Sequence, residues 1–190
     1  MFKSRLFIAS LLLLAVVTAC DDAQEEFSRR PCYLVIDNQM HQDATLGSAM
    51  DAMTPGMFCH ISLTTKSGAR YFSFKNNAGL SSESIFNAID QRRSLIVGMR
   101  NGLIVGFGNL DNPPVFYAFD AQCPNCYDPD MLPEPNHPLS MSDNGIASCG
   151  TCHRKYNMNN GGQIIEGDAG KKMVRYRAST AGPFTVLSVN

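Results

Sequence analysis

Short apolar runs separated by turn-forming residues recur along the chain after residue 30. Segments 57–63 and 70–75 alternate apolar and polar residues, and Ser67–Gly68 between them predicts a β-hairpin. Five more segments have the length and composition of strands: 32–36, 94–99, 115–119, 163–166 and 184–189. Residues 103–107 and 173–177 belong to the same class. The pattern therefore predicts an all-β domain.

Some segments depart from simple strand patterns. Asn101–Gly102 lies between the apolar runs 94–99 and 103–107, which predicts a second hairpin. Residues 82–93 carry apolar side chains at helical spacing, so we expect either one short helix capped by Ser82 or a loop docked by Phe86. Residues 37–56 are ambiguous, and residues 120–144, with five prolines, have the composition of a loop.

The first 20 residues have the features of a bacterial lipoprotein signal. Lys3 and Arg5 precede an apolar run that is too short to span a bilayer stably, and small residues follow it. Val17-Thr18-Ala19-Cys20 resembles the bacterial lipobox, in which the signal is cut before the cysteine and the thiol is lipidated. We therefore expect a signal peptide at 1–19, a lipid anchor at Cys20 and a flexible tether at 20–30. The alternatives are an ordinary signal peptide with a chance cysteine, or an uncleaved anchor.

Composition narrows the class of protein further. About 160 residues remain after the tether, which suggests a single domain at 31–190. The net charge of -1 offers no basic surface for nucleic acid. No Ser/His/Asp arrangement, phosphate loop or carboxylate pair is visible, so an enzyme is not expected. We place the protein in the bacterial cell envelope, tethered to a membrane through Cys20, with an unidentified envelope protein or redox partner.

The chain has seven cysteines, and four of them form two CxxC pairs. Cys123-Pro-Asn-Cys126 and Cys149-Gly-Thr-Cys152 have the spacing of a four-thiolate metal site, because two facing CxxC turns supply a tetrahedron of sulfur atoms. Gly150 is expected to ease close approach of the backbone to sulfur. Since an exported protein meets an oxidising compartment, disulfides within or between the loops are the alternative.

Two cysteines lie outside these pairs and the lipobox. Cys32 and Cys59 fall in predicted strands, where they form either a disulfide or two buried free thiols. A methionine cluster offers a soft-metal site but is the usual composition of core filler: Met40, Met50, Met53 and Met57.

The region 103–177 resembles a Rieske-type domain. The stretch LIVGFGNLDNPPVFYAFDAQCPNC is similar to the strands that lead into the first cluster loop of that family. The stretch CGTCHRKYNMNNGGQIIEGDAGKKMVRYR is similar to the second loop, where the family reads roughly C-P-x-H-G-S-x-F-D, and to the strands after it. Several residues follow the family order there: Cys149, Tyr156, Asn157, Gly161, Gly162, Gly167, Ala169 and Tyr176. The resemblance implies a Rieske-like antiparallel β-sandwich with two cysteine-bearing loops.

Both cluster histidines of the family are missing. Asn125 stands where the first loop has histidine, and Cys152 replaces the second histidine. His137 and His153 lie at the wrong spacing and are expected on the surface or behind the ligands. An ordinary two-histidine, two-cysteine cluster therefore cannot form.

Three cofactors remain open. Four thiolates fit a structural zinc ion, which we prefer because it needs no assembly machinery outside the cytoplasm. An all-cysteine [2Fe-2S] cluster would make the protein an electron carrier with a reduction potential of about -400 mV. Cys149-Gly-Thr-Cys152-His153 also matches the attachment motif of c-type haem, although cytochromes c are helical and the other CxxC pair would have no role.

Overall fold

The computed structural model describes residues 26–190, and the predicted signal peptide and Cys20 lie outside them. The described chain is built of three antiparallel sheets, which confirms the all-β prediction. The largest sheet has six strands in the order β11-β6-β5-β2-β3-β4, and its members are β2 (Phe58–Lys66), β3 (Ala69–Asn76), β4 (Ser81–Ile85), β5 (Leu103–Phe107), β6 (Phe116–Asp120) and β11 (Arg175–Tyr176).

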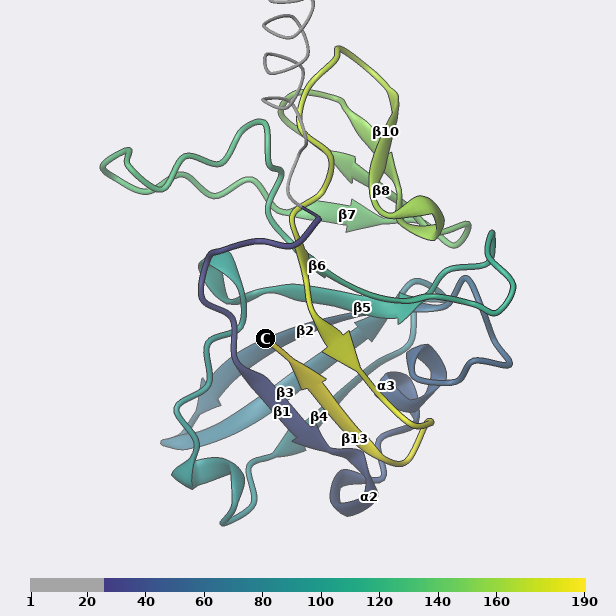
Figure 1. Cartoon of the computed structure of the whole chain (residues 1–190). Helices are drawn as coiled ribbons and strands as arrows, with labels where there is room; N and C mark the ends of the chain where they lie inside the picture. The colour runs from purple at the N-terminus through teal and green to yellow at the C-terminus, as the bar shows by residue number, and fades with distance from the viewer. Residues whose placement is uncertain (1–25) are drawn as a thin grey trace, which may run out of the picture.

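Two smaller sheets lie on either side of the large one (Figure 1). The first has the order β1-β13-β12 and contains β1 (Leu34–Asp37), β12 (Ala178–Ser179) and β13 (Val186–Val189). The second has the order β10-β9-β8-β7 and contains β7 (Leu139–Met141), β8 (Ile146–Cys149), β9 (Lys155–Asn157) and β10 (Gln163–Glu166). The sequence pattern predicted only β10 of this second sheet.

The middle of the large sheet is buried on both faces. Successive side chains of a strand point to opposite faces, so Leu103 and Val105 pack in the core shared with the three-stranded sheet. Ile104, between them, packs in the core that also contains Cys123 and Cys149. The continuous apolar run of β5 follows from this position, because each face of the strand needs apolar residues.

The first predicted hairpin is confirmed. β2 and β3 pair from Cys59–Asn76 to Lys66–Ala69. Ser67 and Gly68 both have positive φ, at 49° and 83°, as the tight turn between twisted strands requires.

The second predicted hairpin is wrong. Residues 94–99 form no strand with β5; Ile96 makes a single antiparallel bridge with Tyr33 instead. The Asn101 side chain hydrogen-bonds to β2 instead. Its Oδ1 accepts from the Leu63 backbone N at 2.9 Å, and its Nδ2 donates to the Leu63 carbonyl at 2.7 Å. The Asn–Gly pair therefore extends the edge of β2 rather than turning one strand onto the next.

The short helix expected at 82–93 is also wrong. The alternative was a loop docked by Phe86, and Phe86 is indeed buried. Ser81–Ile85 is the edge strand β4, and only a 3₁₀ turn at Asp90–Arg92 is helical. Of the apolar residues at helical spacing, Phe86 is buried, but Ile85 and Ile89 are 56% and 52% exposed. No apolar helical face is therefore buried here.

The ambiguous segment 37–56 contains two short helices, α2 (Asn38–His41) and α3 (Ala44–Ala49). Each begins at an aspartate: the side chain of Asp37 accepts from Gln39 N, and that of Asp43 accepts from Leu46 N. α3 covers one end of the larger core through Leu46 and neighbouring residues.

Candidate metal centre

The two CxxC segments form tight turns at the ends of strands. Cys123 follows β6 closely, and its carbonyl accepts from the backbone N atoms of Cys126 at 3.2 Å and Tyr127 at 2.9 Å. Cys149 is the last residue of β8, and its carbonyl accepts from His153 N at 3.1 Å. The backbone N of Thr151 also points at Cys149 Sγ, 3.4 Å away. Each turn thus places its two sulfur atoms on one side.

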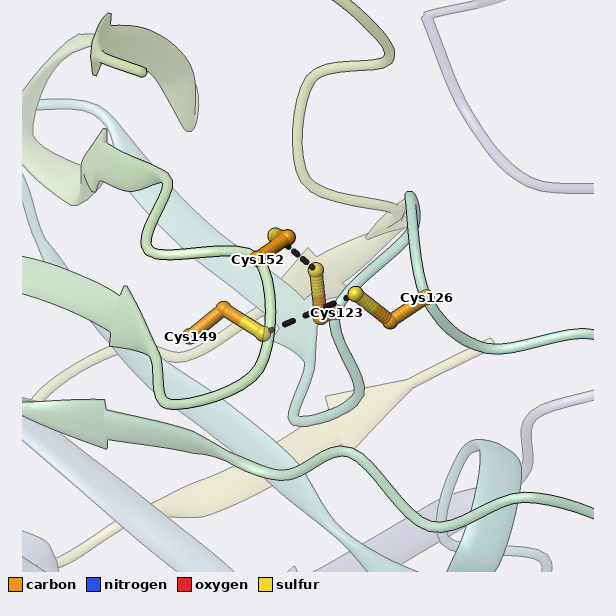
Figure 2. A group of neighbouring side chains, drawn as sticks. All are labelled: Cys123, Cys126, Cys149 and Cys152. Atoms are coloured by element: carbon orange, nitrogen blue, oxygen red, sulfur yellow. Dashed lines mark hydrogen bonds between the residues drawn. The ribbon is translucent and has the colours of Figure 1, made fainter. Parts of the chain in front are cut away.

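The four sulfur atoms of these turns converge. All lie within 4.8 Å of one another, and the pairs joined in Figure 2 come from opposite loops. Cys123 Sγ lies 3.6 Å from Cys152 Sγ, and Cys126 Sγ lies 3.8 Å from Cys149 Sγ. All four are free thiols. The structure therefore brings together the four predicted ligands in a group that can hold a metal ion.

The group is buried on one side and accessible on the other. Cys123 and Cys149 belong to the smaller core, whereas Cys126 and Cys152 are half-buried against it. The first cysteine of each loop is therefore held by the core, and an ion bound to all four sulfur atoms would lie at the edge of that core.

Tyr156 and Asn125 form polar contacts with each other and with the first loop. The Tyr156 hydroxyl lies 3.3 Å from Cys123 Sγ and accepts from Asn125 Nδ2 at 2.9 Å. Because Asn125 occupies an acceptor position of that oxygen, the hydroxyl proton is available to the sulfur. Burial raises the pKa of Tyr156 well above its usual range, which keeps this proton in place. Tyr156 thus contacts one of the four cysteines directly.

Hydrogen bonds and burial act differently on the four thiols. Burial raises the pKa values of Cys123 and Cys126, and the neighbouring thiols raise that of Cys126 further. Burial acts in the same direction on Cys152, but hydrogen bonds from the backbone and side chain of Arg154 outweigh it and lower its pKa to about 6. One thiolate is therefore available at neutral pH, and a bound cation would favour ionisation of the others.

Arg154 also fixes the chain that passes over the second loop. Its Nε donates to the Asp168 carbonyl at 2.9 Å, and its Nη2 donates to the Ala169 carbonyl at 3.1 Å. Gly167 lies close by with φ of 99°, and a Cβ there would come within 3.0 Å of the Arg154 side chain. The close approach explains why residue 167 is a glycine, and the two carbonyl contacts explain why residue 154 carries a guanidinium.

Gly150, His153 and His137 lie in or beside the two loops. A Cβ at Gly150 would meet nothing within 4 Å other than its two chain neighbours, and the backbone N that lies against Cys149 Sγ is that of the next residue, Thr151. His153 takes positive φ, at 59°. His153 is exposed. His137 ties the loops together, since its carbonyl accepts from Cys123 N at 2.9 Å and its Nδ1 lies 2.9 Å from Thr151 Oγ1.

Cys32 and Cys59, the cysteines outside the CxxC pairs, are free thiols and form no disulfide. Cys32 and Cys59 are both free and both buried in the larger core. Burial raises the pKa of Cys32 to about 11 and that of Cys59 further still, so both remain protonated at neutral pH. They fill core volume as small apolar residues.

A serine, a histidine and an aspartate do meet, although no motif in the sequence indicates it. His41 Nδ1 lies 2.6 Å from Ser84 Oγ, and His41 Nε2 lies 3.0 Å from Asp90 Oδ2. The side chains of His41 and Asp90 are only 4% and 1% exposed, and the imidazole packs edge-on against Phe72. With the imidazole and the carboxylate buried, the arrangement joins α2 to β4 and the 3₁₀ turn. Sequence reasoning could not find it because the three residues come from separate elements.

Comparison with known proteins adds no relative: no family model, curated protein or solved structure matches this chain significantly. Within residues 26–190, none of the helices has the length and apolar character needed to cross a membrane. The candidate site therefore rests on its own geometry.

Proposed function

We propose that this protein holds one zinc ion through Cys123, Cys126, Cys149 and Cys152, and that the ion stabilises a binding domain of the cell envelope. The observation that carries the proposal is the mutual approach of all four sulfur atoms to within 4.8 Å. In a tetrahedral site with zinc–sulfur distances of about 2.3 Å, neighbouring sulfur atoms are about 3.8 Å apart. The pairs Cys123–Cys152 and Cys126–Cys149, at 3.6 and 3.8 Å, already have this spacing.

A single ion suits this group better than a [2Fe-2S] cluster. In such a cluster each iron takes two thiolates, and the bridging sulfides keep the two pairs of ligands apart. Here the pairs are not spread, since no two sulfur atoms are more than 4.8 Å apart. The all-cysteine cluster, and with it the electron carrier, is the second candidate.

The haem alternative has the least support. Cys149 and Cys152 each lie against a cysteine of the first loop, so thioether bonds to a porphyrin would break up the four-sulfur group. His153, which would ligate the iron, is exposed on the left-handed turn after Cys152.

A zinc ion with four protein ligands has no open position for substrate or water. The chemistry it supplies is structural: it fixes the two loops and the four-stranded sheet that bears them. Tyr156 donates to one ligand, the amide N of Thr151 points at another, and Arg154 sets its positive charge against a third. These contacts offset the excess negative charge of four thiolates around a divalent ion. We therefore favour a role in protein contact over catalysis.

We further propose that the chain is a lipoprotein anchored at Cys20, with a domain related to the Rieske-type fold whose cluster site has been rebuilt. The lipobox-like residues 17–20 support the anchor. A cysteine-bearing sheet packed on a larger sandwich, with its loops at Cys123 and Cys149, supports the relation of folds. The grouping of the two CxxC loops also supports this relation.

Elemental analysis of protein matured in its own compartment tests the metal. We expect about one zinc per chain and no visible absorbance. Cys126→Ser should lose the zinc, whereas Cys32→Ser, the matched change at a free thiol outside the group, should keep it. A stably folded protein without metal would contradict the proposal. Iron with absorbance that bleaches in dithionite would establish the electron carrier, and a covalent haem band after denaturing electrophoresis would establish the cytochrome.

A further inference from the structure

A large open groove lies beside the first cysteine loop. Its volume is about 1020 Å³, and three parts of the chain, together with Met99, form its walls. The first is residues 27–31, which continue from the proposed anchor; the second is the loop from Pro124 to Asp130; the third is Lys171–Arg175. Ser28 N donates to the Arg175 carbonyl at 2.7 Å, so the N-terminal wall is fixed to β11. The last residues of the expected tether are therefore part of the folded surface.

Positive charge dominates the lining of this groove. Asp128 and Asp130 are its acidic residues. Its basic residues are Arg29, Arg30, Lys171, Lys172 and Arg175. Glu26 neutralises Arg175 at 3.0 Å, and Arg175 stacks between the rings of Phe27 and Tyr117. The other basic groups still outnumber the two carboxylates, although the whole chain has a net charge of only -1.

Lys171 and Lys172 are the free cations of the groove. Within residues 26–190, neither side chain makes an ion pair or hydrogen bond, whereas Lys66 and Lys155 pair with Glu83 and Glu166. The backbone of Lys171 is held on both sides by Asn125, so the pair of lysines has a fixed base. Two adjacent unpaired ammonium groups in a concave site favour an anion with several acceptor oxygens, such as a phosphate ester.

The position of the groove indicates where that anion comes from. Five residues separate Glu26 from Cys20, so the two can lie at most about 22 Å apart, six residue steps of extended chain. If Cys20 bears lipid, the groove wall at residues 27–31 is held close to the headgroups of the bilayer. Anionic headgroups attract juxtamembrane lysine and arginine, by about 1 kcal/mol for each residue near the surface.

We propose that this groove binds the phosphate of an anionic phospholipid headgroup and so sets the orientation of the domain on the membrane. The inference rests on the proposed anchor at Cys20 but not on the identity of the metal. A soluble phosphate ester offers the same oxygens, so the test must distinguish it from lipid.

Lysine labelling on vesicles tests the proposal. The lipidated full-length protein is reconstituted in phosphatidylcholine vesicles, with or without phosphatidylglycerol, and acetylated briefly; mass spectrometry then gives the labelling of each lysine. We expect phosphatidylglycerol to lower labelling of Lys171 and Lys172 by about fivefold or more. Lys66 and Lys75, exposed on the β2–β3 hairpin, are internal controls and should not change.

A pair of variants makes the test specific. Lys172→Glu should abolish the protection of Lys171, whereas Lys75→Glu, with the same change of charge, should leave it intact. Equal labelling of Lys171 and Lys172 in both kinds of vesicle would overturn the proposal, and so would equal protection of all four lysines. Protection by glycerol phosphate on pure phosphatidylcholine vesicles would assign the groove to a soluble ligand instead.

The same preparation separates the two proposals. Vesicle flotation and the mass of the N-terminal peptide report the lipid on Cys20 independently of any labelling. If the anchor is absent, phosphatidylglycerol vesicles added to the free protein still test the groove. Protection of Lys171 and Lys172 would then support headgroup binding while the anchor fails, and its absence would overturn headgroup binding as well.

Discussion

Asn125 and Lys171 are joined by two hydrogen bonds like those between paired strand residues, but Asn125 makes them with its side chain and Lys171 with its backbone. Asn125 Oδ1 accepts from the Lys171 backbone N, and Asn125 Nδ2 donates to the Lys171 carbonyl, each at 2.8 Å. The amide also donates to Tyr156, which contacts Cys123. A residue that cannot readily serve as a metal ligand thus holds the ligand loop in place.

Asn125→Ala should destabilise the protein by about 1 to 3 kcal/mol, because it removes three hydrogen bonds and leaves part-buried groups unsatisfied. Denaturant unfolding of the metal-loaded protein measures the change. Asn160→Ala, at an exposed asparagine, is the control and should stay within about 0.5 kcal/mol of the parent. A similar loss of stability in both variants would show that the Asn125 amide does not hold the loop in place.

Removal of the metal should loosen the four-stranded sheet first. β7 to β10 are short, and two of the ligands belong to the core on which they pack. Hydrogen exchange after treatment with a chelator should rise in residues 139–166, while β2 and β3 keep their protection. Uniform exchange over the described chain would instead mean that the ion stabilises the whole domain as one unit.

The stability of the fold should depend on pH through Asp120. This carboxyl is fully buried, and burial raises its pKa from 3.8 to about 6 despite hydrogen bonds from Met99 N, Gln122 N and Tyr176. A raised pKa means that the folded state favours the protonated form. The contribution to stability is therefore complete below about pH 4 and is lost as the pH rises through about 6.

Asp120→Asn should remove this dependence. Between pH 4.5 and 7.5, the difference in free energy of unfolding between variant and parent should shift in favour of the variant by about 2 kcal/mol. Comparing the two proteins at each pH cancels the acid sensitivity of metal binding, which both share. A difference that does not vary with pH would mean that Asp120 is ionised alike in the folded and unfolded chain.

His41→Phe should cost roughly 3 kcal/mol, although the ring still fits against Phe72. The substitution removes His41 from the buried carboxylate of Asp90, which keeps a hydrogen bond from Asn87 N at 2.9 Å and the more distant Arg93 at 3.7 Å. A double-mutant cycle with Asp90→Asn measures the coupling, because the double variant has no buried charge at this position and should recover part of the loss. Additive losses would show that the two side chains act independently.

Cys20→Ala should prevent lipid attachment and release the protein from the membrane fraction. Incorporation of a labelled fatty acid, followed by fractionation, measures both effects. Cys32→Ala, which removes a thiol from the folded domain, should incorporate label normally. Retention of lipid in Cys20→Ala would place the anchor elsewhere.

The hairpin 57–75 and the cysteine group were predictable because local rules determine them. Alternation over two segments and a turn at Ser67–Gly68 leave few other structures, and CxxC turns orient sulfur atoms by themselves. The capping aspartates of α2 and α3 were local signals too, but helices this short have too little periodicity to be recognised.

The errors occur where distant residues decide the outcome. Asn101–Gly102 would suit a hairpin, yet the Asn101 side chain pairs with Leu63, which is far away in the chain. Ser82–Arg93 has helical spacing, but β3 offers an edge that Ser81–Ile85 completes. Three strands of the sheet around the second cysteine loop, β7, β8 and β9, were missed because they are only three or four residues long.

The double burial of β5 has a consequence for how this sequence can change over generations. Ile104 belongs to one core and its neighbours Leu103 and Val105 to the other, while a Cβ at Gly106 would come within 2.2 Å of the Met57 carbonyl. A substitution on this strand must satisfy two interiors at once, so it has few acceptable alternatives. Saturation mutagenesis should find there the narrowest tolerance of the domain, and natural variants should accumulate on the surrounding loops.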